Sequence, residues 1–321
     1  MQRYIFRRLL LAIPVVLGVI TLVFFTSHLR SGYAQRLAAS CTRDPVSCAQ
    51  TRKAYEHEYG TDKPLVVQYV IFMGNLLKGD LGKSFTTRNS VAREIINRSP
   101  PSVELGLMQI ALSALFAIPI GVMAAVKQDT WVDYVLRIVS IGLLAVPTFF
   151  MGPLILLLCI KAFGWTPPLN LAFYRNITDD PGINLQMMAI PVLAGAFATS
   201  AAVMRLLRSQ LLEVMRQDYV RTAAAKGLRH SVVIVRHTLK NAMIPVLTIL
   251  GLQTAGLIGG NILLERIFNI PGIGLLSVTS IQNNDLPVVT GVVLVVALVI
   301  VATNLLIDLA YGWLDPRIRY S

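Results

Sequence analysis

Six stretches of the chain, each between 21 and 24 residues long, contain no Asp, Glu, Lys or Arg. About 20 predominantly apolar residues are enough for a helix to cross the hydrocarbon core of a bilayer. None of the six alternates apolar and polar residues with a period of two, as the strands of a membrane barrel do. The runs therefore predict an all-α membrane protein with six transmembrane helices. They are residues 9–29, 105–126, 138–160, 181–204, 241–264 and 286–307.

The composition agrees with a membrane location for much of the chain. Hydrophobic residues make up 55% of the 321 residues and charged residues only 14%, whereas a typical soluble domain has about 45–50% and about 25%. These values exclude a disordered chain and disfavour a soluble enzyme. The net charge of +12 would suggest a nucleic-acid partner for a soluble protein. In a membrane protein it indicates basic loops on the cytoplasmic side.

The distribution of Lys and Arg predicts how the spans are oriented. Three arginines precede the first run, two lie in the C-terminal tail, and eight basic residues fall within the 36 residues of 205–240. Because short basic segments stay in the cytoplasm, both termini and this loop are expected there. Residues 30–100 are then extracytoplasmic. Their eleven basic residues do not conflict with this topology, since long segments translocate largely regardless of charge.

The topology divides the chain into three parts. Residues 1–29 form the cytoplasmic N-terminus and the first transmembrane helix, and 30–100 form a long extracytoplasmic segment. Residues 101–321 form a five-helix core that includes the cytoplasmic loop 205–240. We expect the first span to be retained, because its apolar run is too long for the core of a typical signal peptide.

No constellation of catalytic or metal-binding residues occurs in the sequence. The segment from Gly79 to Ser84 resembles the end of a phosphate-binding loop, but Leu77 stands where that motif needs a glycine. The four histidines are scattered and no Cys/His ligand spacing is present. We therefore expect no catalytic residue, no metal site and no cofactor bound by this chain.

The three cysteines fall into two groups. Cys159 lies inside an apolar run and is expected to pack as a small hydrophobic residue. Cys41 and Cys48 lie in the extracytoplasmic segment, where disulfides persist. A local bridge between these two and a pair of free thiols both remain open.

The loop 205–240 carries a helical pattern. Apolar residues recur at helical spacing from Val214 to Ala224, and Gly227 is a residue type that ends helices. A short helix of small residues between two spans suits docking into a groove on another protein. Spacing alone leaves a second interpretation, a basic loop facing the membrane surface.

The residues of this loop resemble those of a known family. Tyr219–Leu228, followed by Arg236–Ala242 and Pro245, is similar to the cytoplasmic loop of permease subunits in peptide-importing ABC transporters. The general importer pattern is Glu-Ala-Ala, three residues, Gly, nine residues and Ile-x-Leu-Pro. Arg221 and Thr222 replace the Glu and the first Ala here, and His-Thr-Leu-Lys replaces the final motif. These departures are typical of the dipeptide and oligopeptide branch.

The resemblance covers nearly the whole chain. Within the peptide/nickel family the chain most resembles the first of the two permease subunits, which has the longer external segment after its first span. No family motif matches residues 40–50, which include both external cysteines. The matching segments are 7–10, 58–69, 79–84, 265–274, 285–287 and 315–320.

The resemblance implies a specific assembly with a type I importer fold in a bacterial or archaeal plasma membrane. A second, homologous permease subunit would pair with this chain in the bilayer, and each would form half of the translocation pathway. Two ATPase subunits would bind ATP and Mg, and an extracytoplasmic binding protein would deliver the peptide. This chain would have no ATPase site and would couple to the ATPases through a cytoplasmic helix. The coupling segment comprises Tyr219, Val220, Arg221, Thr222, Ala223, Ala224, Ala225, Lys226, Gly227 and Leu228.

Polar residues inside apolar spans are candidates for the translocation pathway. The alternative for each is a hydrogen bond between helices. Asn304, near the inner end of the last run, belongs to the same class. The candidates for the pathway are Gln109, Gln253, Thr254 and Asn261.

Three other functions are alternatives for a chain with this pattern. An importer for nickel, glutathione or another small solute is nearly indistinguishable by sequence, because the binding protein chiefly sets substrate choice in the family. An ion-coupled secondary transporter would show internal repeats and carboxylates at mid-membrane, and the runs contain no Asp or Glu. A structural membrane scaffold would leave the alanine-rich loop unexplained.

Overall fold

The computed structural model describes residues 2–29, 63–168, 174–258 and 261–314. Within these ranges the chain is helical, with one isolated bridge between Lys83 and Ser90 and no named strand. Five helical stretches are long and apolar enough to cross a membrane, and a sixth is a bent pair. The predicted all-α, six-span architecture is therefore confirmed. The five stretches are Phe6–Thr26, Val91–Val126, Pro181–Met215, His230–Thr254 and Leu286–Ile307.

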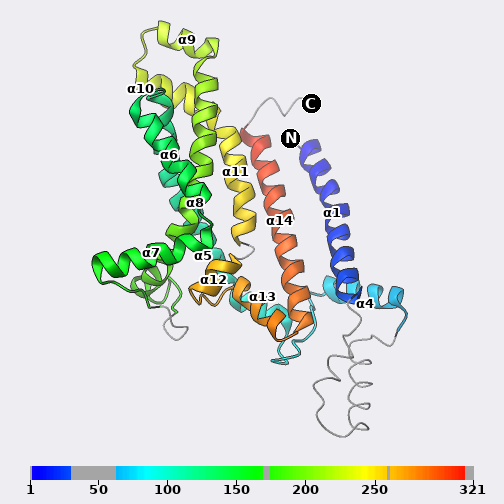
Figure 1. Cartoon of the computed structure of the whole chain (residues 1–321). Helices are drawn as coiled ribbons and strands as arrows, with labels where there is room; N and C mark the ends of the chain where they lie inside the picture. The colour runs from blue at the N-terminus through cyan, green and yellow to red at the C-terminus, as the bar shows by residue number, and fades with distance from the viewer. Residues whose placement is uncertain (1, 30–62, 169–173, 259–260, 315–321) are drawn as a thin grey trace.

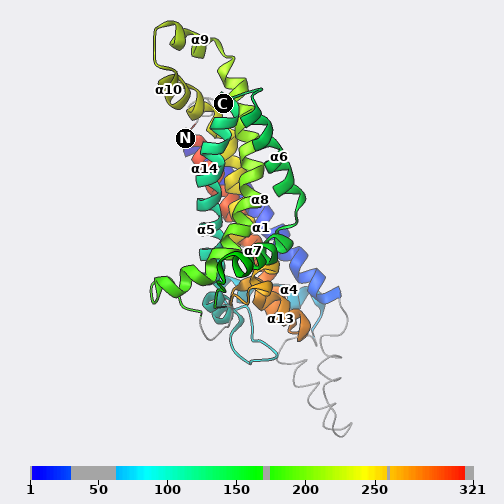
Figure 2. The ribbon, with the colours of Figure 1, turned by 60° about the vertical axis from the view of Figure 1, so that its left-hand side comes forward.

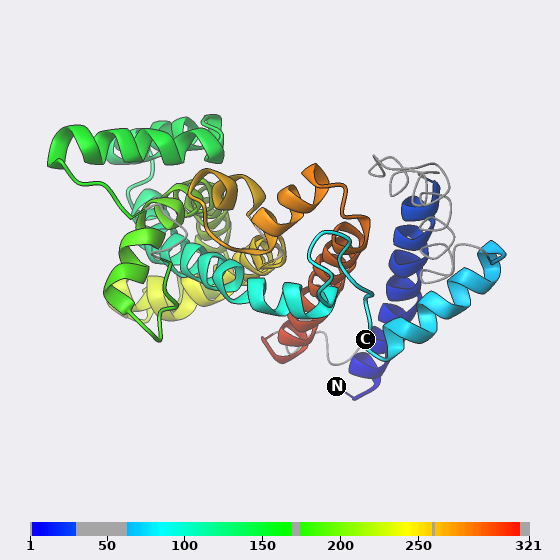
Figure 3. The ribbon, with the colours of Figure 1, turned by 90° about the horizontal axis from the view of Figure 1, so that it is seen from below.

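The helices lie in a row, seen from the side in Figure 1 and from one end in Figure 3. α1 (Gln2–Leu29) stands at one edge beside α14 (Leu286–Leu314), and α7 (Thr148–Phe163) extends from the other edge. The start of α1, the end of α14 and the short helix α9 (Asp218–Ala225) lie toward one end of the row. We call this the α9 end. α4 (Leu65–Leu77), α12 (Ile262–Ile267) and α13 (Ile273–Gln282) lie at the opposite end, as Figure 2 also shows.

The centre of the row is formed by α5 (Val91–Val126), α8 (Pro181–Met215) and α11 (Lys240–Ile258). Ala117, Leu207 and Val246 are each 0% exposed in their shared core. A small residue brings the helices together: a Cβ on Gly121 would lie 3.0 Å from Cδ2 of Leu207. Close backbone approach of this kind is how membrane helices gain dispersion energy where lipid removes the hydrophobic drive.

The third predicted span is not one straight helix. It is divided into α6 (Trp131–Ala145) and α7, which meet at an angle of 109°. Pro147 lies in the break, where it caps α7 with an extended backbone. Because proline lacks an N–H and disfavours helical geometry in the residue before it, an apolar run containing it does not guarantee a single straight span.

A buried ion pair fixes α6 against α8. The Nε and Nη2 atoms of Arg208 donate to the two carboxylate oxygens of Asp133, both at 2.7 Å. Asp133 is 0% exposed. Its Oδ2 also accepts from the backbone N–H of Asp129 at 3.1 Å, so the start of α6 is held by three hydrogen bonds.

Two carboxylates organise the end opposite α9. Glu265 of α12 is 0% exposed and accepts from Ser102 Oγ of α5 at 2.8 Å and from the Leu275 N–H of α13 at 3.0 Å. Asp285, 2% exposed, accepts from the hydroxyl of Ser84 and from the N–H groups of Phe85 and Thr86. These bonds join α5, α12, α13 and the loop after α4 into one unit.

Candidate functional site

α9 sits at the tip of a projection beyond the row of helices (Figures 1 and 2). α8 continues to Met215, eleven residues past the apolar run that ends at Met204. The first part of the predicted loop 205–240 is therefore the end of α8. The rest is α9, the three-residue α10 (His230–Val232) and a π-helix, η2 (Val233–Leu239), which leads into α11.

α9 has a buried face and an exposed face. Val220 and Ala223 are 6% and 7% exposed, and both pack against Val233. Ala224 and Ala225 are exposed, as are the flanking Tyr219, Arg221, Thr222, Lys226, Gly227 and Leu228. Two alanines on an open helix face let another protein approach the helix backbone closely. The exposed face, and not Ala223, is thus the surface available to a partner.

Gly227 ends the helical turn as the sequence predicts. α9 ends at Ala225, and Gly227 adopts φ +81°, a left-handed conformation that L side chains rarely adopt. Its N–H donates to the Ala224 carbonyl at 3.0 Å. A Cβ built on Gly227 would meet nothing within 4 Å. The glycine is therefore required by backbone conformation and not by lack of space.

A polar contact that the sequence pattern does not predict ties α9 to α11. Asn241 Nδ2 donates to the Tyr219 hydroxyl at 2.7 Å and to the His237 carbonyl at 3.3 Å. In η2, the Thr238 hydroxyl donates to the Val233 carbonyl five residues earlier at 3.1 Å. Single π turns are frequent at functional sites, but the sequence offers no pattern that distinguishes one from an ordinary helical turn.

The structure brings together two of the four pathway candidates. Gln109 is 0% exposed; its Nε2 donates to the Pro191 carbonyl at 3.0 Å and its Oε1 accepts from Asn261 Nδ2 at 3.4 Å. Asn261 also lines a cavity of about 590 Å³ together with Thr148, at the bend between α6 and α7, and Thr199. Gln109 itself forms the interhelical hydrogen bonds that were the alternative interpretation.

The other two candidates are not joined to this pair. Thr254 donates its hydroxyl to the Leu250 carbonyl of its own helix at 2.7 Å. Gln253 is half-buried on α11. Cys41 and Cys48 fall outside the described residues, while Cys159 is a free thiol packed against a hydrophobic cluster. The described residues contain no group of His, Cys, Asp or Glu arranged to hold a metal ion.

Comparisons with known proteins match the chain from end to end. Residues 117–320 match the family model described as binding-protein-dependent transport system inner membrane component. Residues 1–106 match the N-terminal model of the same family. The two matches together cover all of the chain except residues 107–116 and 321.

Curated relatives match over their full length. The glutathione transport system permease protein GsiC of Pectobacterium atrosepticum is 36% identical over 321 residues, covering 100% of both chains. The dipeptide transport system permease protein DppB of Alkalihalophilus pseudofirmus and the oligopeptide transport system permease protein AppB of Bacillus subtilis are each 35% identical, again with 100% coverage of both chains.

Proposed function

The chain belongs to the family of binding-protein-dependent transport system inner membrane components, and from this we propose that it serves as one permease subunit of an importer for di- and oligopeptides. Its full-length similarity to dipeptide and oligopeptide permeases supports this substrate class. Glutathione is the second candidate, because a glutathione permease is equally similar, at 36% identity. Glutathione is itself a tripeptide, so both candidates share peptide chemistry.

The exposed face of α9 supports a coupling role. α9 projects at the end where α1 begins and α14 ends, which is the cytoplasmic end in the topology derived from Lys and Arg. Ala224 and Ala225 are open there, and Arg208–Asp133 and Tyr219–Asn241 tie the projection to the spans. A partner that moves α9 would therefore move α8 and α11. We assign the exposed residues between Tyr219 and Leu228 to docking on an ATPase subunit, and the buried Val220 and Ala223 to holding the helix in place.

The cavity beside Asn261 is the proposed share of this chain in the translocation pathway. It lies at the bend between α6 and α7 and is bordered by the polar groups of Thr148, Thr199 and Asn261. Gln109 positions Asn261, because its Oε1 accepts a hydrogen bond from Asn261 Nδ2. The other half of the pathway would come from the homologous permease. The two ATPase subunits would supply ATP and Mg, and the extracytoplasmic protein would supply the peptide.

Copurification in mild detergent tests this proposal. We expect a second permease and two ATPase subunits to accompany the chain from bacterial plasma membranes, with an extracytoplasmic binding protein joining in the presence of substrate. Recovery of a functional homodimer without these subunits would contradict it. Uptake of labelled dipeptides, longer peptides, glutathione and nickel would then identify the substrate. Nickel uptake without peptide uptake would overturn the peptide assignment.

A further inference from the structure

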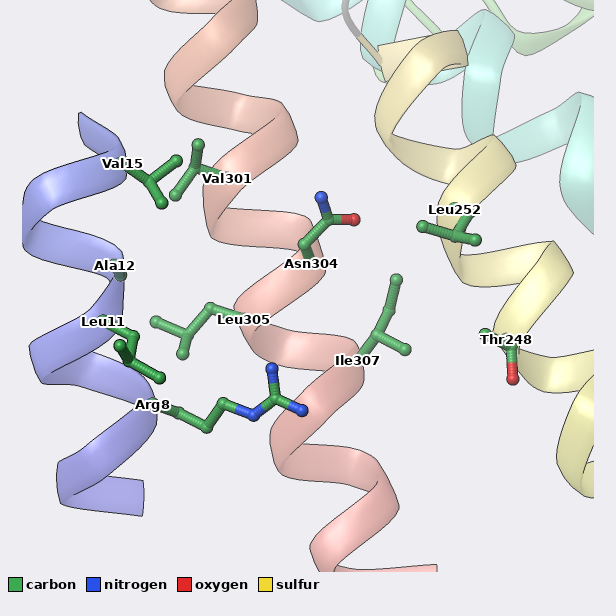
Figure 4. Close-up of a pocket in the computed structure, with 10 residues that line it drawn as sticks. All are labelled: Arg8, Leu11, Ala12, Val15, Thr248, Leu252, Val301, Asn304, Leu305 and Ile307. Carbon is green, nitrogen blue, oxygen red and sulfur yellow. The ribbon is translucent and has the colours of Figure 1, made fainter. Parts of the chain in front are cut away.

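A cavity separate from the proposed pathway lies where α1, α11 and α14 meet. Its volume is about 400 Å³, and its walls are mostly apolar, including Leu11 and Ala12 of α1, Leu252 of α11 and Leu305 of α14. Three polar side chains also line it: Arg8 of α1, Asn304 of α14 and Thr248 of α11. The Thr248 hydroxyl donates to the Ile244 carbonyl of its own helix. Figure 4 shows the Arg8 guanidinium extending from α1 toward α14, with the Asn304 carboxamide deeper along α14.

Arg8 and Asn304 both sit near one edge of the hydrocarbon core. Arg8 is two residues inside the span that starts at Phe6, and Asn304 is three residues before the end of the span at Ile307. At 1.5 Å rise per residue these offsets are about 3 Å and about 4.5 Å along the helices. In the proposed topology this edge faces the cytoplasm, where phospholipid phosphates and ester groups are found.

The chemistry of the two side chains fits those lipid groups. A guanidinium presents its N–H donors in a planar fork that matches phosphate oxygens. The Asn304 Oδ1 atom is buried and has no hydrogen-bond partner in the described part of the chain. A buried amide oxygen without a donor is costly, so a purely hydrocarbon occupant would leave that cost in place. The ester region of a phospholipid lies deeper than its phosphate, and its carbonyls hold water that can donate to Oδ1.

We propose that this cavity binds one anionic phospholipid of the cytoplasmic leaflet. Its phosphate lies against Arg8, its ester region against Asn304, and one acyl chain fills the apolar walls formed by α1, α11 and α14. Basic pockets between transmembrane helices on the cytoplasmic side are recognised sites for such head groups. The lipid would contact α1, α11 and α14, because residues of all three helices line the cavity. The depth assigned to the lipid rests on the proposed topology.

Native mass spectrometry of the purified chain with its accompanying subunits tests the site. The preparation receives equal amounts of phosphatidylglycerol and phosphatidylcholine. We expect wild type to retain one phosphatidylglycerol per chain, and Arg8→Gln to lower that retention about tenfold, the loss expected for one charge-assisted hydrogen-bonded contact. Arg7→Gln is the matched control, because it removes the same charge from an exposed neighbour that does not line the cavity. It should leave retention within twofold of wild type.

A second pair of variants tests whether filling the cavity, without removing a charge, displaces the lipid. Ala12→Trp fills the cavity and should abolish lipid retention, whereas Ile13→Trp, at a position 58% exposed on the same helix, should not. Equal loss in Arg7→Gln and Arg8→Gln would show general surface attraction and overturn the site. Equal retention of the two lipids by wild type would also overturn it. Loss of the second permease from Arg8→Gln with lipid retention unchanged would identify the cavity as a protein interface instead. These readouts do not depend on the transported substrate, so the lipid site and the peptide assignment can fail separately.

Discussion

The two ends of the molecule differ in how far apart in the sequence their hydrogen-bonded residues lie. Opposite α9, carboxylates join segments far apart in sequence: Ser102 and Glu265 are separated by 163 residues, and Ser84 and Asp285 by 201. At the α9 end, the longest-range hydrogen bond described for α9 links Tyr219 to Asn241, 22 residues away. One end holds its buried carboxylates, Glu265 and Asp285, with partners from distant parts of the chain. The other leaves a helix face exposed, as a surface that another subunit completes.

Glu265→Ala should produce the largest loss of stability and would test the end opposite α9. Without this carboxylate, the Ser102 hydroxyl and the Leu275 N–H lose buried acceptors. Two unsatisfied buried donors cost between about 2 and 6 kcal/mol. Thermal unfolding of the detergent-purified protein should show a large drop in melting temperature. Glu213→Ala, at an exposed position at the end of α8, is the control, and equal melting of the two variants would refute a structural role for Glu265.

Substitutions on the two faces of α9 should separate docking from packing. Ala224→Asp places a charge on the exposed face and should reduce peptide uptake tenfold or more, as for a central interface residue of about 1.4 kcal/mol or greater, while thermal stability stays unchanged. Ala223→Asp buries a charge against Val233 and should lose both uptake and stability. If Ala224→Asp transports normally with full stimulation of ATP hydrolysis, the coupling assignment is wrong.

Gly227 provides a test of backbone conformation alone. Gly227→Ala should destabilise the turn after α9 by about 1–2 kcal/mol, because the residue has φ +81° and L residues disfavour that region. Hydrogen exchange of α9 should accelerate while α12 and α13 are unaffected. Gly227→Glu causes the same backbone strain and also adds a charge. It should abolish uptake while part of the complex still assembles. Unchanged exchange in Gly227→Ala would show that the turn relaxes without cost.

Tyr219→Phe should have a smaller effect, because it removes one partly exposed hydrogen bond. The loss of the Asn241–Tyr219 contact, 2.7 Å long, is expected to cost about 1 kcal/mol. A double-mutant cycle with Asn241→Leu, read out by exchange at α9, would isolate the pair. Additive effects of the two substitutions would mean that the contact does not couple α9 to α11.

The mildest test is the pH dependence of the buried carboxyl. Burial raises the pKa of Glu265 above its usual 4.5, although hydrogen bonds from Ser102 and from backbone N–H groups oppose this. The folded chain therefore holds the Glu265 proton more tightly than the unfolded chain does. This contribution to the free energy of unfolding is fully present below about pH 4.5. It is lost as the pH rises through the pKa that Glu265 has in the folded chain. Glu265→Gln should flatten this decline in melting temperature, and an unchanged pH profile would contradict the assignment.

Much of the fold could be predicted because a bilayer demands long charge-free runs. The prediction of six spans is confirmed, but it did not show that two of the runs contain more than one helix: the third is divided into α6 and α7 at Pro147, and the fifth covers α11 and the start of α12. It also missed the continuation of α8 to Met215, since a helix leaving the membrane keeps its hydrogen bonds while gaining charged residues.

Some features of the candidate site could be predicted from the sequence, and others could not. Gly227 could be placed at the end of a helix because that role depends on local conformation. The hydrogen-bond partners of Glu265 and Gln109 could not be predicted, because packing brings Ser102 and Asn261 to them across more than 150 residues. Helical periodicity also could not decide which face of α9 is buried until the position of Val233 was known.

The length of α8 has a mechanical consequence. Its 35 residues form one helix from the Asp180 cap to the base of the projection, which corresponds to about 52 Å, more than the full thickness of about 40–45 Å of a bilayer with its head groups. A rod of that length acts as a lever. Tilting it by about 5° displaces one end by about 4.5 Å relative to the other, so a small rotation imposed in the cytoplasm becomes a shift of nearly a whole helical turn at the far side of the membrane.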